Sequence, residues 1–441
     1  MFVARFIKLT ALLITVLFHQ TWASSDLTAI HSLNKTITPE QMHDDIDTWW
    51  RWVKDTHPDL SLRIEDIKTF ESKLNELKSE LDSPLSVNEF LTHISVLNGQ
   101  FNDGHMNIMI PSQRRLVEQL ANDNQGLFPF EVKIREGEIS IASKLGGEKS
   151  PYENARIVAI NNQPIESIYT RLMSRMYGDT VRHREALLST KFALYYWLFI
   201  GKKEEFIIEF SDKSLPRTLI VDASKSKPMS MSKPTFDDTF KFEILSAGEA
   251  KMTINEFWWH DKQAFYDFTR DAFKTIQEHN IQHLIIDVSL NRGGDDDMWK
   301  KGLLTYIADK PYRHTSFYQK KVIAAHQDEG EKIGDVVSRQ YEKYERSDVS
   351  NPLHFSGKVS VIIGVQTYSS AILFANTVQD HEFGRLVGAP TGGYSWQTGG
   401  IQFFTLPNSN LRAVSPRFYL VRPSGRGLNQ VVKPNTNEQA Q

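Results

Sequence analysis

The stretch Val359–Gly400 reads VSVIIGVQTYSSAILFANTVQDHEFGRLVGAPTGGYSWQTGG and determines how the rest of the chain is interpreted. It opens with an apolar run, Val359 to Val365, that is typical of a buried strand, and after a sharp turn it continues with helical apolar spacing. Ser369 and Ser370 lie at that turn. A serine there stands beside the first free N–H groups of a helix, at the positive end of its dipole. Either serine is therefore a candidate nucleophile whose oxyanion those N–H groups would stabilise.

Helix capping is the alternative interpretation of the same two serines, because serine is a favoured N-cap residue in proteins of every function. The Ser-Ser pair alone does not distinguish a nucleophile from a cap. The choice between the two depends on what the other parts of the chain contribute to a common site.

Length and composition set the broad class of the chain. At 441 residues it is too long for one ordinary domain and indicates two or three. It is 40% hydrophobic and 24% charged, as globular proteins are, and its formal net charge of -3, without a basic stripe, argues against a nucleic-acid partner. There is no cysteine, which excludes disulfides, a cysteine nucleophile and thiolate metal sites.

The first 23 residues have the pattern of a signal peptide. Arg5 and Lys8 precede a short apolar run, Leu9 to Phe18, and Ala23 offers a small residue at the cleavage point. The run is too short to span a bilayer comfortably, and the sequence has no other long apolar stretch. We expect an exported protein, periplasmic or secreted, that is not stably inserted in the membrane after cleavage.

Residues 24–115 are expected to form an N-terminal helical region, because apolar residues recur there at helical spacing. The region ends at the turn Asn102-Asp103-Gly104-His105, before a short alternating strand. A histidine in a loop is most often a polar surface residue. A turn can also project an imidazole into a cleft, and imidazole is the common general base near neutral pH, so His105 is a candidate base.

The rest of the chain divides into a β-rich middle domain at 116–235, an αβ domain at 236–434 and a disordered tail at 435–441. The division falls in residues 222–237, which are rich in Ser, Lys and Pro. In the later domain, strands alternate with amphipathic helices. The expected fold class is α/β in the broad sense, an α+β multidomain chain with a helical layer, a β-rich middle part and an αβ core.

A buried strand, His283 to Val288, leads into Asn291-Arg292-Gly293-Gly294. Glycine at a strand end lets backbone N–H groups approach a ligand closely. The three acids Asp295–Asp297 follow. They could bind a metal, but capping of the next helix is the favoured interpretation, because acids match a helix N-terminus and no partner ligands stand at metal spacing. We expect no metal and no cofactor.

Four separated pieces, in this order, resemble the tail-specific or carboxyl-terminal processing serine peptidases, including their tricorn-core-like branch. The pieces are Asn102–His105, Leu284–Gly294, Thr367–Ala371, and Leu386–Gly393 with Phe404–Ser409. The resemblance covers nearly everything after residue 38. It implies a PDZ-like middle part, a crotonase-like catalytic core, and peptide or protein substrates; it indicates no oligomeric state.

The resemblance also implies the site residues of a serine peptidase that acts through an acyl-enzyme. Ser369 would be the nucleophile, and His105 would be its general base. Asp380, eleven residues after Ser369, matches a family aspartate that supports the site. The oxyanion hole would combine the backbone N–H of Ser370 with that of Gly293 or Gly294.

The chain departs from the family pattern in four places, one of which is Ser289 where an Arg is common after the strand aspartate. Tyr394 stands where the processing branch has its lysine base, so a Ser–Lys dyad is not expected. The tricorn-like branch has a serine just before the histidine, where this chain has Gly104. That branch also has an orienting glutamate, whose position falls near Leu428–Asn429 without a carboxylate. The third member of the site is therefore left open.

Two other functions compete with a peptidase. A catalytically inactive family member would bind a peptide or an apolar ligand in the interdomain cleft, and the missing lysine and orienting acid favour it. An esterase of the α/β-hydrolase type is disfavoured, because the nearest string to its G-x-S-x-G motif, Gly393–Gln397, lacks the final glycine.

Overall fold

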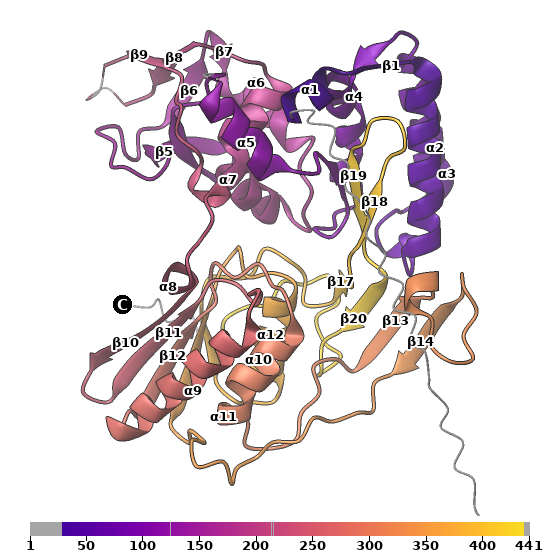
Figure 1. Ribbon diagram of the computed structural model, residues 1–441. Helices are drawn as coiled ribbons and strands as arrows, with labels where there is room; N and C mark the ends of the chain where they lie inside the picture. The colour runs from indigo at the N-terminus through magenta and orange to yellow at the C-terminus, as the bar shows by residue number, and fades with distance from the viewer. Residues whose placement is uncertain (1–28, 124, 213, 215, 436–441) are drawn as a thin grey trace, which may run out of the picture.

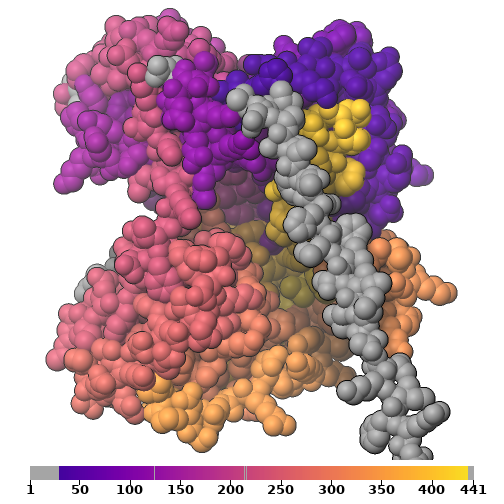
Figure 2. Space-filling model, viewed as in Figure 1, coloured from indigo at the N-terminus to yellow at the C-terminus, as the bar shows by residue number. Residues whose placement is uncertain are grey.

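The computed structural model describes residues 29–435, apart from residues 124, 213 and 215. The expected signal peptide and residues 436–441 of the expected tail lie outside this range. Two hydrophobic cores divide the molecule into an upper body, mostly residues 33–231, and a lower body, residues 240–432 (Figure 1). The two bodies meet at a waist in the space-filling view (Figure 2). This mixed helical and sheet architecture confirms the predicted fold class.

The N-terminal part of the upper body is helical, as expected. Its helices are α1 (Ala29–Asn34), α2 (Pro39–Thr56), α3 (Ile67–Glu80), α4 (Val87–Ile94) and α5 (Gln113–Asn122). Capping boxes start α2 and α4, where Thr38 and Ser86 each accept a backbone N–H three residues on. The short strands β1 (Thr36–Ile37) and β2 (Leu85–Ser86) pair between these helices, and β3 (Asn107–Met109) follows His105 directly.

The middle part of the upper body is rich in strands and contains one long helix. β4 (Phe130–Arg135) and β5 (Glu138–Lys144) form a hairpin, and a four-stranded sheet has the order β7–β6–β8–β9. The strands of that sheet are β6 (Ile157–Ile160), β7 (Gln163–Pro164), β8 (Glu205–Phe210) and β9 (Thr218–Asp222). Helices α6 (Ile165–Met173) and α7 (Val181–Phe199) pack beside them, and α7 lies against β4.

The lower body is built on a five-stranded sheet of order β10–β11–β12–β15–β16. Its strands are β10 (Phe240–Ser246), β11 (Glu249–Ile254), β12 (His283–Asp287), β15 (Lys358–Ile363) and β16 (Arg385–Gly388), of which the last four run parallel. The helices are α8 (Phe236–Thr239), α9 (Lys262–Glu278), α10 (Asp296–Trp299), α11 (Thr305–Ile307) and α12 (Ser370–Asp380). The central strands are apolar because both sheet faces are covered. Their carboxyl ends carry the loops that form the site.

Two smaller sheets connect the lower body to the upper one. The first has the order β14–β13–β20–β17, and the second has the order β18–β19–β3. Their strands are β13 (Phe317–Lys321), β14 (Val336–Gln340), β17 (Gln397–Gly399), β18 (Gln402–Thr405), β19 (Arg412–Ser415) and β20 (Phe418–Val421). The hairpin β18–β19, yellow in Figure 1, rises beside α2 and pairs with β3, so it packs in the upper core. The pairing brings the segment after His105 next to the chain that leaves β17.

The tip of this hairpin is held by Asp45, a fully buried carboxylate on α2. Asp45 accepts the backbone N–H groups of Asn408 and Ser409, each at 2.9 Å. It also accepts the side-chain amide of Asn408 at 3.0 Å. These bonds tie the N-terminal helical layer to a loop more than 360 residues away in the sequence.

Asp45→Asn is expected to destabilise the protein by about 1–3 kcal/mol, because an amide NH₂ would face backbone donors that a carboxylate now satisfies. Equilibrium unfolding in urea measures the change. The matched control is Asp47→Asn on the same helix, which removes only the half-exposed ion pair with Lys78 (2.8 Å) and should cost about 0–1 kcal/mol. Equal losses in the two variants would contradict the assigned role of Asp45.

Among the described residues, no helix is both long and apolar enough to cross a membrane.

Candidate active site

Ser369 occupies a strained turn between β15 and α12. Its backbone has φ 53° and ψ −126°, a region that residues other than glycine rarely adopt. It stands at the N-cap position of α12, but its side chain makes no capping hydrogen bond. The capping alternative therefore fails for Ser369. A strained serine whose hydroxyl is released from the helix is typical of a functional position.

The structure brings Ser369 together with His105, although 264 residues separate them. The Nε2 atom of His105 lies 3.0 Å from Oγ of Ser369, within the range required for proton transfer from a nucleophile to its base. His105 is 7% exposed and comes from the upper body, whereas Ser369 comes from the lower body. The pair therefore exists only where the two bodies meet.

The surroundings of His105 keep its imidazole neutral. Burial lowers the pKa of His105, and the nearby charge of Arg63 lowers it further. The carboxylates of Asp103 and Asp179 raise it, but they do not offset burial. The pKa therefore lies below the ordinary value of about 6.5, so that the ring can accept a proton at neutral pH.

On its other side, the His105 ring meets two hydroxyl groups, each of which is bound to a buried carboxylate. Nδ1 lies 3.1 Å from Oγ1 of Thr398 and 3.3 Å from Oη of Tyr368. The hydroxyl of Thr398 lies 2.9 Å from both oxygens of Asp103, and that of Tyr368 lies 2.7 Å from Asp179. Thr398, Tyr368, Asp103 and Asp179 were not predicted as site residues from the sequence.

The backbone N–H groups near Ser369 differ in whether they could donate a hydrogen bond to an oxyanion. The N–H of Gly293 donates to Oδ1 of Asn291 at 2.8 Å, so the prediction that it is an oxyanion donor is wrong. The N–H groups of Gly294 and Ser370 have no hydrogen-bond partner in the described part of the chain. Gly293 allows Ser369 to approach closely because it has no side chain. A Cβ at position 293 would lie 2.6 Å from Cβ of Ser369.

The side chain of Ser370 is used for packing rather than for chemistry. Its Oγ donates to Asp296 at 2.5 Å and accepts the indole N–H of Trp299 at 2.9 Å. Asp295 caps α10 by accepting the N–H of Asp297, which confirms the capping interpretation of the acidic run. Over residues 29–435 with their gaps, no group of three or more His, Asp or Glu side chains could hold a metal ion.

The prediction that Asp380 supports the catalytic site is wrong. It ends α12, eleven residues after Ser369, which is roughly 16 Å along a helix. Its carboxylate forms a bidentate pair with Arg422 at 2.9 and 2.5 Å and accepts the N–H of Ser424. Asp380 thus anchors the segment after β20 and contacts neither Ser369 nor His105.

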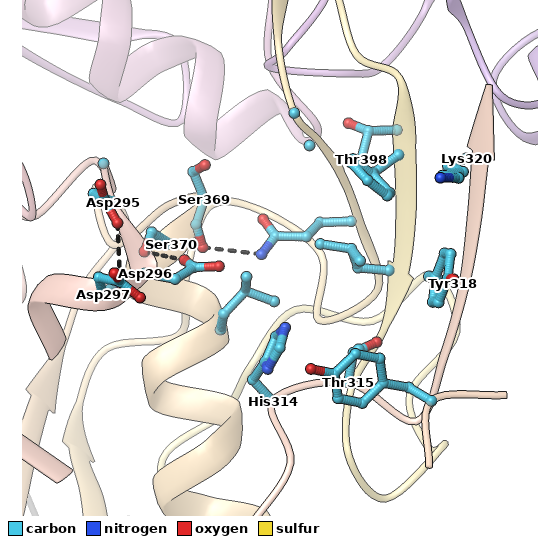
Figure 3. A pocket seen from close by; sticks show the side chains of 18 of the residues that line it. Asp295, Asp296, Asp297, His314, Thr315, Tyr318, Lys320, Ser369, Ser370 and Thr398 are labelled. Carbon is cyan, nitrogen blue, oxygen red and sulfur yellow. Dashed lines mark hydrogen bonds between the residues drawn. The ribbon is translucent and has the colours of Figure 1, made fainter. Parts of the chain in front are cut away.

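A cavity of about 780 Å³ opens beside Ser369 (Figure 3). One wall comes from α10 and α12 and includes the three acids and Leu373. The opposite wall comes from β13, β17 and β20 and includes Tyr318, Thr398 and Phe418. Asp295 is paired with Lys262, and Asp297 with Lys301, so most of the charge on the acidic wall is balanced. A peptide side chain next to Ser369 would enter this cavity.

Comparison with known families assigns the part of the chain that carries the serine. Residues 250–437 match the family described as peptidase family S41. This stretch forms an S41 domain. The assignment confirms the predicted resemblance to carboxyl-terminal processing peptidases and makes the chain a serine-type peptidase, a hydrolase. No curated protein sequence matches the chain.

Solved structures match more of the chain than the S41 domain alone. A mutant of CPAF aligns with a TM-score of 0.66 at 11% identity, over 90% of this chain and 92% of that one. Mature CPAF complexed with lactacystin gives a TM-score of 0.65 at 11% identity, over 90% and 93%. At this identity the likeness shows a shared fold, which includes the upper body.

Gly293→Ala is expected to reduce kcat at least about 100-fold, because the new methyl group would push Ser369 and the N–H of Ser370 (2.9 Å away) out of place. Initial rates on a peptide substrate and circular dichroism test it. The matched control is Gly334→Ala, which has a similar φ (92° against 101°) but nothing within 4 Å of the added Cβ. A variant that keeps wild-type kcat would contradict the close approach.

Proposed function

We propose that this S41 domain hydrolyses peptide bonds through an acyl-enzyme, with Ser369 as the nucleophile and His105 as the general base. The observation that carries the proposal is the 3.0 Å contact between Nε2 of His105 and Oγ of Ser369 at a strained turn. The family's processing branch uses a lysine base, but this chain has Tyr394 at that position. Tyr394 serves the site through its backbone N–H, which donates to Asp179 at 3.0 Å.

The reaction follows from the positions of these groups. His105 Nε2 removes the proton from Oγ of Ser369 as Oγ attacks the peptide carbonyl. The free N–H groups of Gly294 and Ser370 stabilise the negative oxygen of the tetrahedral intermediate. His105 then gives its proton to the leaving amine, and the amine departs as the acyl-enzyme forms. Water, activated by the same imidazole, releases the carboxylic acid and restores Ser369.

The inactive-binder hypothesis is not favoured. A protein that had lost catalysis would have no reason to keep a nucleophile at positive φ, which costs about 1–3 kcal/mol, in hydrogen-bond contact with a neutral imidazole. The proposed substrates are peptides or proteins that reach the cavity beside Ser369. The proposed site of action is the periplasm or the exterior of the cell, as the N-terminal pattern of charges and apolar residues favours.

The test is labelling of the full-length protein with a fluorophosphonate probe, beside Ser369→Ala and His105→Ala. Labelling should disappear in Ser369→Ala, and peptide hydrolysis should fall by about 10⁴-fold or more in both variants. Ser370→Ala is the control for the neighbouring hydroxyl, which bonds to Asp296 and Trp299 within the described part of the chain, and it should keep fluorophosphonate labelling. Labelling that persists without Ser369 would place the nucleophile elsewhere.

The pH dependence of kcat/KM provides a second test. The neutral form of His105 is the base, and protonation on the acid side abolishes it. Burial lowers the pKa of His105, so the acid limb should have its midpoint below the ordinary value of about 6.5. Initial rates between pH 4 and 9 measure the midpoint. A limb centred well above 6.5 would mean that another group is the base.

A further inference from the structure

The atoms around Nδ1 of His105 determine which nitrogen of the ring carries the proton. Burial raises the pKa of the Asp103 carboxyl, but the charge of Arg63, together with the hydrogen bond from the backbone N–H of His105, holds the pKa below its ordinary range. Asp103 is therefore an ionised acceptor. The single hydroxyl proton of Thr398, 2.9 Å from both Asp103 oxygens, must point to that carboxylate. The Thr398 oxygen can then only accept from Nδ1–H of His105.

Tyr368 repeats this arrangement at the same nitrogen of the ring. Burial, together with the charges of Asp179 and Asp103, raises the pKa of Tyr368 well above its ordinary value, so its hydroxyl keeps its proton. That proton is donated to Asp179 at 2.7 Å. The phenol oxygen is left to accept from Nδ1–H of His105 at 3.3 Å. Asp179 is fixed in turn by the backbone N–H groups of Gly104 and Tyr394.

We propose that Thr398 and Tyr368 are the positioning residues of this peptidase, and that their hydroxyls link Nδ1 of His105 to the buried carboxylates of Asp103 and Asp179. The inference rests on the proposed function of His105. The two linked hydroxyls take the place of the single orienting acid, since neither carboxylate bonds to the ring directly. The nearer one, Asp103, lies 3.8 Å from Nδ1.

The glycine before His105 fits this arrangement. A Cβ at Gly104 would lie 2.5 Å from Oη of Tyr368 and 3.0 Å from the ring of His183. A serine at position 104 is therefore incompatible with the position of the tyrosine hydroxyl. The ring of His183 packs against that of Tyr368, with the ring centroids 4.3 Å apart and the planes tilted by 37°. The absence of a side chain at position 104 is therefore a condition for the position of the Tyr368 hydroxyl.

The hydroxyls of Thr398 and Tyr368 and the carboxylates behind them would support catalysis by orienting and stabilising the His105 ring. No proton moves from the ring to these groups. With Nδ1 protonated, Nε2 carries the lone pair that faces Oγ of Ser369. When the proton of Ser369 moves to Nε2, the ring becomes an imidazolium, and no proton passes on to either carboxylate. Their negative charges and the two hydroxyl oxygens stabilise that cation. Nδ1 keeps its own proton throughout, and the proton on Nε2 leaves with the amine.

Kinetics of three full-length variants, normalised by fluorophosphonate titration of active sites, test the proposal. Thr398→Val keeps the shape of the side chain but removes the hydroxyl, and it should lower kcat about 100-fold with KM changed less than about threefold. Thr398→Ser restores a hydroxyl and should recover activity to within about fivefold of wild type. Tyr368→Phe should lower kcat about tenfold.

The pH profile separates positioning from packing. Thr398→Val removes a bond that favours the imidazolium, so the acid limb of kcat/KM should move to lower pH. A variant that is merely misfolded would have fewer active sites and an unmoved limb. Wild-type kcat in Thr398→Val, or an equal loss in Thr398→Ser with an unmoved limb, would overturn the proposal.

Nitrogen-15 NMR of the histidine-labelled protein at pH 7.5 tests the proton position without any substrate, with His105→Gln used to assign the signals. The wild-type ring should show a protonated Nδ1 and an unprotonated Nε2, and Thr398→Val should shift the ring toward mixed tautomers. A wild-type ring protonated on Nε2 would overturn the proposal. A protonated Nδ1 in a protein that neither labels nor hydrolyses peptides would support the arrangement and refute the proposed function instead.

Discussion

The buried carboxylate of Asp103 is the group on which the geometry of the site depends. It is fully inaccessible to solvent and would be costly to bury without partners. Three donors satisfy it, one from its own turn and two from other parts of the chain: the backbone N–H of His105 at 2.7 Å, the guanidinium of Arg63 at 3.4 Å, and the hydroxyl of Thr398. Each partner is placed by satisfying the same charge. The loop that carries His105 is therefore fixed relative to the lower body.

The strain at Ser369 is held by bonds that belong to the turn around it. Asn291 accepts the N–H of Tyr368 at 3.0 Å through its backbone and fixes Gly293 through its side chain. Gln397 donates to the carbonyl of Ser369 at 2.9 Å from β17. Because neighbouring segments hold both sides of the turn, Ser369 would not have to reorganise as charge develops in the proposed reaction.

The sequence alone predicted the elements that have strong local patterns. The strand, turn and helix around Ser369 and the capping role of Asp295 follow from periodicity and capping rules, and the structure reproduces them. The charged stretch at 328–350 contains β14, which pairs with β13. The side chains of β14 show no strand periodicity, because β14 is stabilised by its pairing with β13, which the local sequence does not reveal.

A residue of the candidate site could be predicted from the sequence where its type is common in catalysis and its turn is recognisable. It could not be predicted where residues that are distant in the sequence come together only in the fold. Ser369 and His105 had such signals. Asp380 was misplaced because a shared spacing along the chain does not establish a contact in space. Asp103 and Tyr368 lie next to predicted residues but look like ordinary turn and core residues, and Asp179 carried no signal at all. Only the three-dimensional arrangement reveals that their hydroxyl and carboxyl groups converge on one ring.

The hairpin β18–β19 determines when this protein can become active during its synthesis. Ser369 and His105 are 264 residues apart, and the strands that hold the upper body against β17 include residues 412–415. A growing chain cannot pair β19 with β3 until residues 412–415 have been made. Ser369 and His105 are therefore held together only after this late hairpin has formed. A peptidase built in this way does not threaten its surroundings, or itself, while it is still being synthesised.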